Sequence, residues 1–432
     1  MNPPIQSVSR SYKWQVVGML WLVCCFNYAD RQSVFSVFPK LKQEFGFDAL
    51  ELGLIGSAFM WSYALVAPLA GFICDQLARK RLILGGCAFW SAVTALIGLC
   101  AKFWQFAAVL ALTGLGEAFY FPASLSLMSD YHGRATRSRA LAFHQSGVYV
   151  GTILGGWLGA WFAVRLGWRS GFYIFGAAGV VLALVLSRLL REPKRGAADG
   201  PETGAQPAAP AGPAPSVGEA LRIILAKPTA LLLMLVFLGA NFVATIFLTW
   251  TPSFLVAKFG FKLTTAGLFG GLFIHLASAV SAPLGGWIAD RLALKWVSGR
   301  ILVQAAGLLI GAIFVCLVGL TDDVRTLLVA MTFFGVCKGL YDSNLWSALY
   351  DVIEPRARGT AAGIMNTVGW GGGALGPLFV GAATKYGHYG SEAANMGHAI
   401  AWGGGVYLAG GFVLAGTALW RAPRDVPAAQ PR

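Results

Sequence analysis

Apolar runs of membrane-spanning length recur along almost the whole chain, and they constrain its fold more than any other feature. The first begins at Trp14 and the last ends near Trp420. About 20 apolar residues is the length that an α-helix needs to cross a bilayer. The chain has 12% charged residues, about half the charge density of soluble domains. The pattern argues against a soluble enzyme and against a cleaved signal peptide with one soluble domain. We predict an all-α polytopic membrane protein.

Twelve spans account for the apolar runs, and an even number of spans places both termini on one side. If the termini are cytoplasmic, 22 of the 33 Lys and Arg residues lie on the cytoplasmic side, 9 on the opposite side and 2 within spans. Cytoplasmic loops are enriched in Lys and Arg. We therefore predict cytoplasmic termini and a bacterial inner membrane location. The predicted spans are 14–38, 51–73, 82–101, 104–128, 139–163, 170–190, 229–255, 265–288, 301–320, 325–349, 360–384 and 397–420.

The composition changes to Ala, Pro, Gly and polar residues between Glu192 and Val217. Such a stretch buries too little apolar surface to fold alone. We predict a six-helix bundle at 1–191, a cytoplasmic linker at 192–228 and a second six-helix bundle at 229–432.

The two halves repeat each other at corresponding places. Gly71 and Asp75 follow the second span, and Gly286 and Asp290 follow the eighth. Closely spaced glycines recur in the fifth and eleventh spans. Repetition of this kind predicts two bundles related by a pseudo-twofold axis. These glycines are Gly147, Gly151, Gly155 and Gly159, and then Gly369, Gly373 and Gly376.

The loop after the second span resembles the loop motif of the major facilitator superfamily, G-x-x-x-D-(R/K)-x-G-x-(R/K)-(R/K). Gly71, Asp75, Lys80 and Arg81 match it, whereas Gln76 and Ala78 depart from it. The resemblance covers essentially the whole chain. It implies twelve transmembrane helices in two pseudo-symmetric bundles and a loop that latches them together on the cytoplasmic side. The expected latch consists of Gly71, Asp75, Arg79, Lys80, Arg81, Asp290 and Arg291.

Two further segments resemble branches of this superfamily. Residues 27–31, Asn-Tyr-Ala-Asp-Arg, and residues 114–118, Gly-Leu-Gly-Glu-Ala, are similar to the anion:cation symporters and the Spinster-like proteins. The stretch from Gly53 to Trp90 is closer to the Spinster-like proteins.

Five charged residues fall within predicted spans, where each needs a partner, a wet cavity or a neutral form. They are Asp30, Arg31, Glu117, Lys338 and Asp342. Carboxylates in a low-dielectric cavity can take up and release protons near neutral pH, so Asp30 and Glu117 are candidate proton-coupling sites. The alternative is a structural ion pair with Arg31. In the resembling symporters, the matching acids are coupling sites, which favours the first interpretation.

Arg31 has two interpretations as well. Its planar guanidinium could bind a carboxylate or phosphate bidentately, or it could balance the charge of Asp30. The resembling families carry an arginine seven residues before the fourth-span glutamate, and this chain has Leu110 there. We therefore expect Glu117 to lack its usual partner.

The other candidate substrate-binding residues are polar groups on span faces. Lys338 and Asp342 could bind substrate or form an intrahelical pair, because their spacing of four puts them on one helix face. Asn27, Tyr120, Asn241 and Asn366 complete the candidate set, although such residues also hold helices together. His144 is a further candidate for a residue that shuttles protons, weaker than Asp30 and Glu117.

Several cofactor classes find no support in the sequence. The seven cysteines form no CxxC or Cys/His cluster. No Walker-type lysine loop indicates ATP, and the glycines at 371–376 lie in a predicted membrane helix rather than after a strand. We expect no cofactor and no metal, and partners limited to a small-molecule substrate, protons and the lipid bilayer. The net charge of +14 reflects topology rather than nucleic-acid binding. We expect a monomer.

We predict a proton-coupled secondary transporter of a small organic anion, a carboxylate or sugar acid, that works by alternating access. The first alternative is a Spinster-like carrier of lysolipid or another amphiphile. The second is a membrane sensor or an intramembrane enzyme. The sequence shows no catalytic constellation for such an enzyme.

Overall fold

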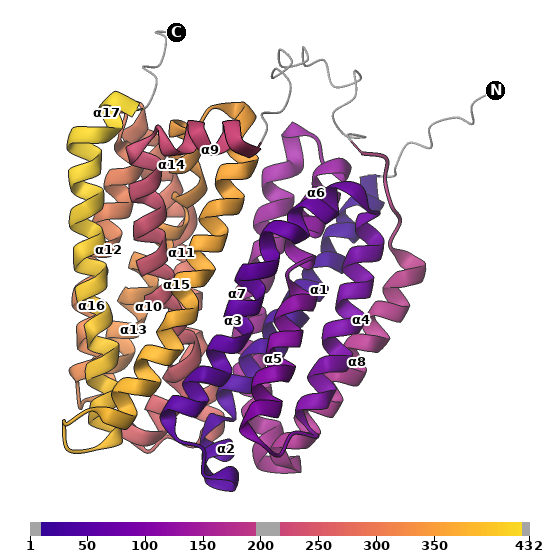
Figure 1. The fold of residues 1–432 in the computed structure, drawn as a ribbon, viewed down its shortest axis with the longest axis vertical. Helices are drawn as coiled ribbons and strands as arrows, with labels where there is room; N and C mark the ends of the chain where they lie inside the picture. The colour runs from indigo at the N-terminus through magenta and orange to yellow at the C-terminus, as the bar shows by residue number, and fades with distance from the viewer. Residues whose placement is uncertain (1–9, 196–216, 426–432) are drawn as a thin grey trace.

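The computed structural model describes residues 10–195 and 217–425, and within these ranges it contains helices and no strand. The first half forms one bundle of long helices (Figure 1). A π-helix, η1, joins its last two helices. The elements of this N-terminal bundle are α1 (Arg10–Ser36), α2 (Phe38–Phe45), α3 (Ala49–Gln76), α4 (Arg79–Ile97), α5 (Phe103–Glu117), α6 (Tyr120–Tyr131), α7 (Arg134–Phe162), η1 (Ala163–Gly167) and α8 (Trp168–Leu189).

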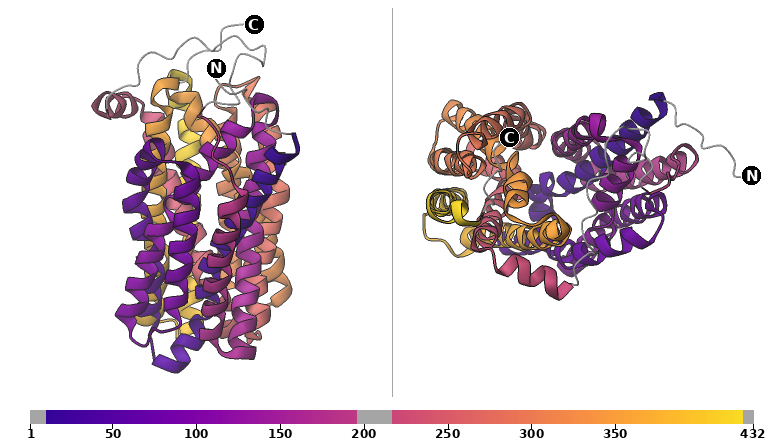
Figure 2. Two further views of the ribbon diagram at one scale, coloured as in Figure 1. Left: turned by 90° about the vertical axis from the view of Figure 1, so that its right-hand side faces the viewer. Right: turned by 90° about the horizontal axis from the view of Figure 1, so that it is seen from above.

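The second half forms a bundle beside the first, and the two are separate groups of helices when seen along their long axis (Figure 2). α9 runs across the end of this C-terminal bundle instead of along it. The elements are α9 (Val217–Leu225), α10 (Pro228–Phe259), α11 (Leu263–Ala293), α12 (Gly299–Leu320), α13 (Val324–Asp342), α14 (Leu345–Val352), η4 (Pro355–Ala357), α15 (Arg358–Tyr386), α16 (Glu392–Gly416), η5 (Thr417–Arg421) and α17 (Ala422–Asp425).

Within residues 10–195 and 217–425, twelve helical spans cross the long dimension of the molecule, as predicted. Nine stretches of the described chain are long and apolar enough to span a membrane, and the one at 139–189 contains two helices, α7 and α8. α1 and α15 are of similar length. They fall outside the nine; α1 carries charged residues near both of its ends, and α15 is rich in glycine. Residues 192–195 and α9 belong to the predicted linker, and residues 196–216 lie outside the described residues, so its boundaries stay a prediction.

The fourth and tenth spans are each broken near their middle. α5 ends at Glu117 and α6 begins at Tyr120, with Pro122 in its first turn. Proline has no backbone N–H, so it interrupts the helical hydrogen bonds at this point. In the C-terminal bundle α13 ends at Asp342 and α14 begins at Leu345. The breaks lie at corresponding places in the two bundles, and each leaves an acidic residue at the end of a helix.

Glycines in α7 let it approach α1 at backbone distance. A Cβ atom added at Gly155 would lie 2.2 Å from the carbonyl oxygen of Ala29, and one at Gly151 would lie 2.3 Å from that of Cys25. Small residues permit such close helix packing in membranes. The glycine repeat of the fifth span therefore positions the part of α1 that carries the buried charges.

The two bundles are joined at one end. We call the end where α17 lies the termini side and the other end, where α2 lies, the far side (Figure 1). Among the described residues, every hydrogen bond or ion pair between the bundles lies in the half toward the far side. Gln32 donates to the carbonyl of Leu248 at 3.0 Å, and Ser57 donates to that of Ala374 at 2.6 Å. The ribbons of the bundles diverge toward the termini side.

Candidate functional site

A buried ion pair lies inside the N-terminal bundle. The Arg31 guanidinium on α1 donates through Nη2 to Oε2 of Glu117, at the end of α5. The side chains are 4% and 0% exposed. The family arginine is absent at Leu110, as the sequence shows, and Glu117 pairs with Arg31, the ion pair given as the alternative for this acid. Arg31 supplies the positive charge that the sequence lacks at Leu110, and Asn27 lies next to the same carboxylate.

Aromatic rings surround the Arg31 guanidinium. Its central carbon lies 4.2 Å from the ring centre of Phe59, 4.6 Å from Tyr28, 5.3 Å from Trp370 and 6.0 Å from Tyr63. Ring faces attract a cation over such distances. Trp370 comes from α15, and its ring centre lies 4.8 Å from that of Tyr63. The cage therefore includes both bundles, so a ligand on Arg31 would lie between them.

Asp30 adjoins Arg31 in sequence and has a different environment. It is 2% exposed, and neither of its carboxylate oxygens has a hydrogen-bond partner among the described residues. It lines a cavity of about 10 Å³ together with Thr94, Leu110 and Thr113, a space of about one water molecule. Asp30 is therefore a buried acid without a counter-ion, and the structural pair proposed as its alternative role is made by Glu117 instead.

A second charged pair lies in the C-terminal bundle. Lys338 donates to Asp342 one helical turn later on α13, which is the intrahelical pair that the spacing predicted. The side chains are 16% and 32% exposed. On the neighbouring helix α11, the His275 ring lies 5.8 Å from that of Tyr149 in the N-terminal bundle.

The remaining polar candidates divide between partly exposed positions and the interior of one bundle. Asn241 and Asn366 are partly exposed, and the Asn241 amide donates to the Phe237 carbonyl at 3.4 Å. Tyr120 does not join the site. Its hydroxyl donates to the carbonyl of Leu20 at 2.6 Å and lies 2.8 Å from Nε2 of His144, entirely within the N-terminal bundle.

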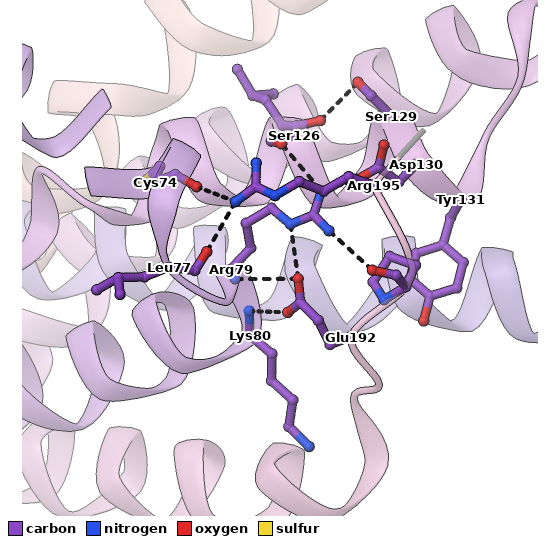
Figure 3. A network of polar contacts seen from close by, with 12 residues as sticks. Cys74, Leu77, Arg79, Lys80, Ser126, Ser129, Asp130, Tyr131, Glu192 and Arg195 are labelled. Atoms are coloured by element: carbon purple, nitrogen blue, oxygen red, sulfur yellow. Dashed lines mark hydrogen bonds and ion pairs between the residues drawn. The ribbon is translucent and has the colours of Figure 1, made fainter. Parts of the chain in front are cut away.

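The expected latch residues of the first half hold their own bundle together. Arg79, which is 1% exposed, binds Asp130 and donates through Nε to Glu192 at 2.9 Å (Figure 3). The Glu192 carboxylate also accepts the backbone N–H of Lys80 at 2.6 Å, and Lys80 Nζ donates to the Ser187 carbonyl at 2.7 Å. An acid at a helix N-terminus satisfies free amide groups. Residues just beyond α8 thus fasten the turn between α3 and α4.

No described latch residue forms a hydrogen bond or ion pair between the bundles in this conformation. Asp290 binds Arg300, which also binds Asp351, and Arg291 lies over the ring of Trp287. Gly71 and Arg81 are surface positions, and the side chain of Asp75 lies outside the described residues. The latch therefore stays a prediction for another conformation.

Ion pairs between the bundles occur on the far side instead. Lys385 donates to Asp48 at 2.6 Å, and Lys42 binds Glu392. Burial opposes the charged form of Asp48, but hydrogen bonds from Lys385 and from backbone amides outweigh it and lower the pKa of this carboxyl below its usual value. The hydrogen bond to Asp48 in turn raises the pKa of Lys385. Each partner therefore stabilises the charged form of the other.

Comparison with known proteins identifies the family. The sequence model of the Major Facilitator Superfamily matches residues 20–377 and 276–431. The chain belongs to this superfamily. A sodium-dependent phosphate transport protein from Arabidopsis chloroplasts is 29% identical over 94% of the chain and 78% of its own length. A D-galactonate transporter from Escherichia coli is 29% identical over 88% of the chain and 91% of its own length.

The fold comparison agrees with this assignment. The crystal structure of a bacterial homologue of the human lysosomal transporter Spinster covers 98% of the chain and 100% of its own chain, with a TM-score of 0.78 and 22% identity. The family match and the transporters among its relatives make the chain an integral membrane transporter rather than an enzyme. The resemblances to the superfamily, to anion transporters and to Spinster-like proteins are confirmed.

Sequence reasoning missed most of the aromatic cage. Phe59 and Tyr63 lie four residues apart on α3 and read as ordinary lipid-facing or packing residues. Trp370 is recognisable as part of a polar face of the eleventh span, but nothing in the sequence shows that it reaches Arg31. Only the three-dimensional structure shows that residues of α3 and α15 meet at Arg31.

Proposed function

We propose that this protein is a proton-coupled transporter of a small organic anion, a carboxylate or sugar acid. The observation that carries the proposal is the Arg31–Glu117 pair beside the unpartnered Asp30. A guanidinium is the side chain best suited to bind a carboxylate. In this conformation the Glu117 carboxylate accepts a hydrogen bond from the Arg31 guanidinium, as a substrate carboxylate would.

Proton binding can control this arrangement. An ionised carboxylate buried without a partner costs several kcal/mol, so we propose that Asp30 carries a proton in this state. Protonation of Glu117 would remove the charge that holds Arg31, and an anion could then take its place. Loading of protons and substrate is in this way linked through one arginine.

The arrangement of the bundles supports alternating access. Ion pairs and hydrogen bonds join them on the far side, and none of those described joins them on the termini side. We propose that the termini side is cytoplasmic, as the distribution of Lys and Arg predicts, so this conformation faces inward. Breaking the far-side contacts and forming the loop latch would then produce the outward-facing state.

The relatives support the substrate class and leave the coupling ion open. The names of two relatives specify phosphate and D-galactonate, which are both anions. One of these names also specifies sodium dependence. A proton gradient and a sodium gradient must therefore be compared directly.

The test is uptake into proteoliposomes containing the purified protein. Galactonate and other sugar acids are offered under an inward proton gradient, under a sodium gradient, and in counterflow without a gradient. We expect accumulation driven by the proton gradient. Asp30→Asn and Glu117→Gln should abolish accumulation and retain counterflow, whereas Arg31→Lys should weaken both, because it keeps the charge and loses the bidentate geometry.

Asp322→Asn is the matched control, because Asp322 is a 93% exposed acid paired with Lys258 at the far side. It should accumulate substrate like the wild type. Accumulation by both acid variants would refute proton coupling, and a sodium requirement would replace the proton in the proposal. Uptake of lysolipid with no response to sugar acids would favour the Spinster-like alternative.

A further inference from the structure

The cavity of about 10 Å³ beside Asp30 gathers polar residues from three helices. Asp30 and Arg31 come from α1, Thr94 from α4 and Thr113 from α5, and the other lining residues are apolar. Thr94 is fully buried, and its hydroxyl has no hydrogen-bond partner among the described residues. The same is true of both carboxylate oxygens of Asp30 and of Nε and Nη1 of Arg31. Three residues thus bring buried polar atoms without a described partner to one small space.

The chemistry of these atoms specifies what the cavity can hold. A buried polar group without a partner is costly, and a space of this size accommodates about one water molecule. A water molecule can accept a hydrogen bond from the Arg31 guanidinium and donate to the Asp30 carboxyl and the Thr94 hydroxyl. A metal cation accepts nothing from a guanidinium, and an anion donates nothing to a carboxyl group. Of the three, water alone satisfies both kinds of group.

We propose that Thr94 and one bound water molecule form the hydrogen-bonding environment in which Asp30 takes up and releases its proton. This inference rests on the proposed function and adds Thr94 to it as a positioning residue. Hydrogen bonds to an ionised carboxylate are about twice as strong as those between neutral groups. The hydroxyl and the water therefore stabilise the ionised Asp30 that must exist once the proton has left.

The same water connects Asp30 to the arginine of the site. When Asp30 is ionised, the water donates to it and accepts from Arg31, so the carboxylate acts on the guanidinium without touching it. Thr113 cannot replace Thr94 in this role, because its hydroxyl already donates to the Val109 carbonyl of its own helix at 3.0 Å. Thr94 is therefore the hydroxyl that is free to donate into the cavity.

The first test separates proton coupling from binding and folding. Thr94→Val replaces the hydroxyl by a methyl group, and Thr94→Ser retains the hydroxyl. Uptake of sugar acids into proteoliposomes is measured under a proton gradient and in counterflow. In Thr94→Val the ratio of proton-driven uptake to counterflow should fall about tenfold or more, which is the value of one hydrogen bond to a charged group. Thr94→Ser should retain the wild-type ratio.

The second test observes Asp30 and the water directly and requires no substrate. The infrared C=O band of protonated Asp30 is the carboxyl band that Asp30→Asn loses, and the bound water gives an O–H band that shifts in heavy-oxygen water. Thr94→Val should move both bands, because each group loses a hydrogen-bond partner. Thr251→Val is the control, since it removes a buried hydroxyl that donates to the Phe247 carbonyl of its own helix at 2.6 Å. It should leave both bands unchanged.

The outcomes separate the two proposals. Unchanged bands or an unchanged ratio in Thr94→Val, or a Thr94→Ser variant that is equally impaired, overturns the inference and leaves proton-coupled transport intact. An equal fall of uptake and counterflow also overturns it, because such a loss is structural. Should Thr94→Val fail to fold, the wild-type spectrum decides: an Asp30 band at the frequency of a carboxyl group without hydrogen bonds refutes the inference. If Asp30→Asn loses no carboxyl band, Asp30 carries no proton and the proposed function itself fails.

Discussion

Glu117→Gln tests whether the buried pair with Arg31 stabilises the fold as its geometry requires. Removing one partner of a buried pair costs about 3 to 5 kcal/mol, because the other charge stays buried. The glutamine oxygen can still accept a hydrogen bond from the guanidinium, worth about 1 kcal/mol. The expected loss is therefore about 2 to 4 kcal/mol.

The loss can be converted into a change of Tm. Unfolding entropies of about 2.1 cal/mol/K per residue over 432 residues give about 0.9 kcal/mol/K. Glu117→Gln should therefore lower Tm by about 2 to 4 °C. The assay is intrinsic tryptophan fluorescence of the purified protein in detergent during heating.

A double variant and a control make this assay specific. Arg31→Met with Glu117→Gln removes both charges and should recover most of the lost stability, since no buried charge remains. Asp322→Asn breaks a surface pair with Lys258 and should move Tm by less than about 1 °C. A Tm of Glu117→Gln equal to the wild type, or a double variant no more stable than the single one, would refute the reasoning.

Three further predictions concern packing, pH and topology. Gly155→Val should prevent the packing of α1 against α7, since even a Cβ atom there would lie 2.2 Å from the Ala29 oxygen. Gly405→Ala is the control, because a Cβ atom added there meets nothing within 4 Å. A normal size-exclusion profile for Gly155→Val as well as for the control would contradict the packing argument. The lowered pKa of Asp48 means that its bridge to Lys385 stabilises the far-side closure above the ordinary carboxyl value of 3.8 and is lost as the pH falls through the lowered value. At pH 7, labelling of a cysteine introduced on the far side should therefore be greater in Asp48→Asn than in the otherwise unchanged protein, because the variant has lost the bridge; equal labelling of the two proteins would count against the bridge. A reporter fused to the C-terminus should be active in the cytoplasm, and activity on the opposite side would overturn the inward-facing assignment.

The loop latch shows how sequence motifs can specify residues without specifying their partners. The motif marks Arg79 and Lys80 as important, and Arg79 is indeed almost fully buried. Its partners in this conformation are Asp130 and Glu192 of the same bundle. A motif that acts in several conformations cannot indicate which contacts are present in one of them.

Tyr120 illustrates a second limit of sequence reasoning. It lies three residues after Glu117, and residues three and four apart are neighbours on a helix, so an unbroken helix would place both on one face. The helix breaks between these residues, at Ala118 and Phe119. Tyr120 contacts Leu20 and His144 inside the bundle.

The sequence by itself determined the twelve spans, the two related halves and the set of charged residues within the membrane. Each of these depends on local composition, since a helix must cover its own backbone polar groups and present apolar side chains to lipid. The tertiary structure decided which charges meet. Arg31 and Glu117 are 86 residues apart in sequence, and they come together because α1, packed against the glycines of α7, faces the broken end of α5. Asp30, on the neighbouring position, remains without a partner for the same reason: adjacent residues on a helix point about 100° apart, and packing assigns them different neighbours.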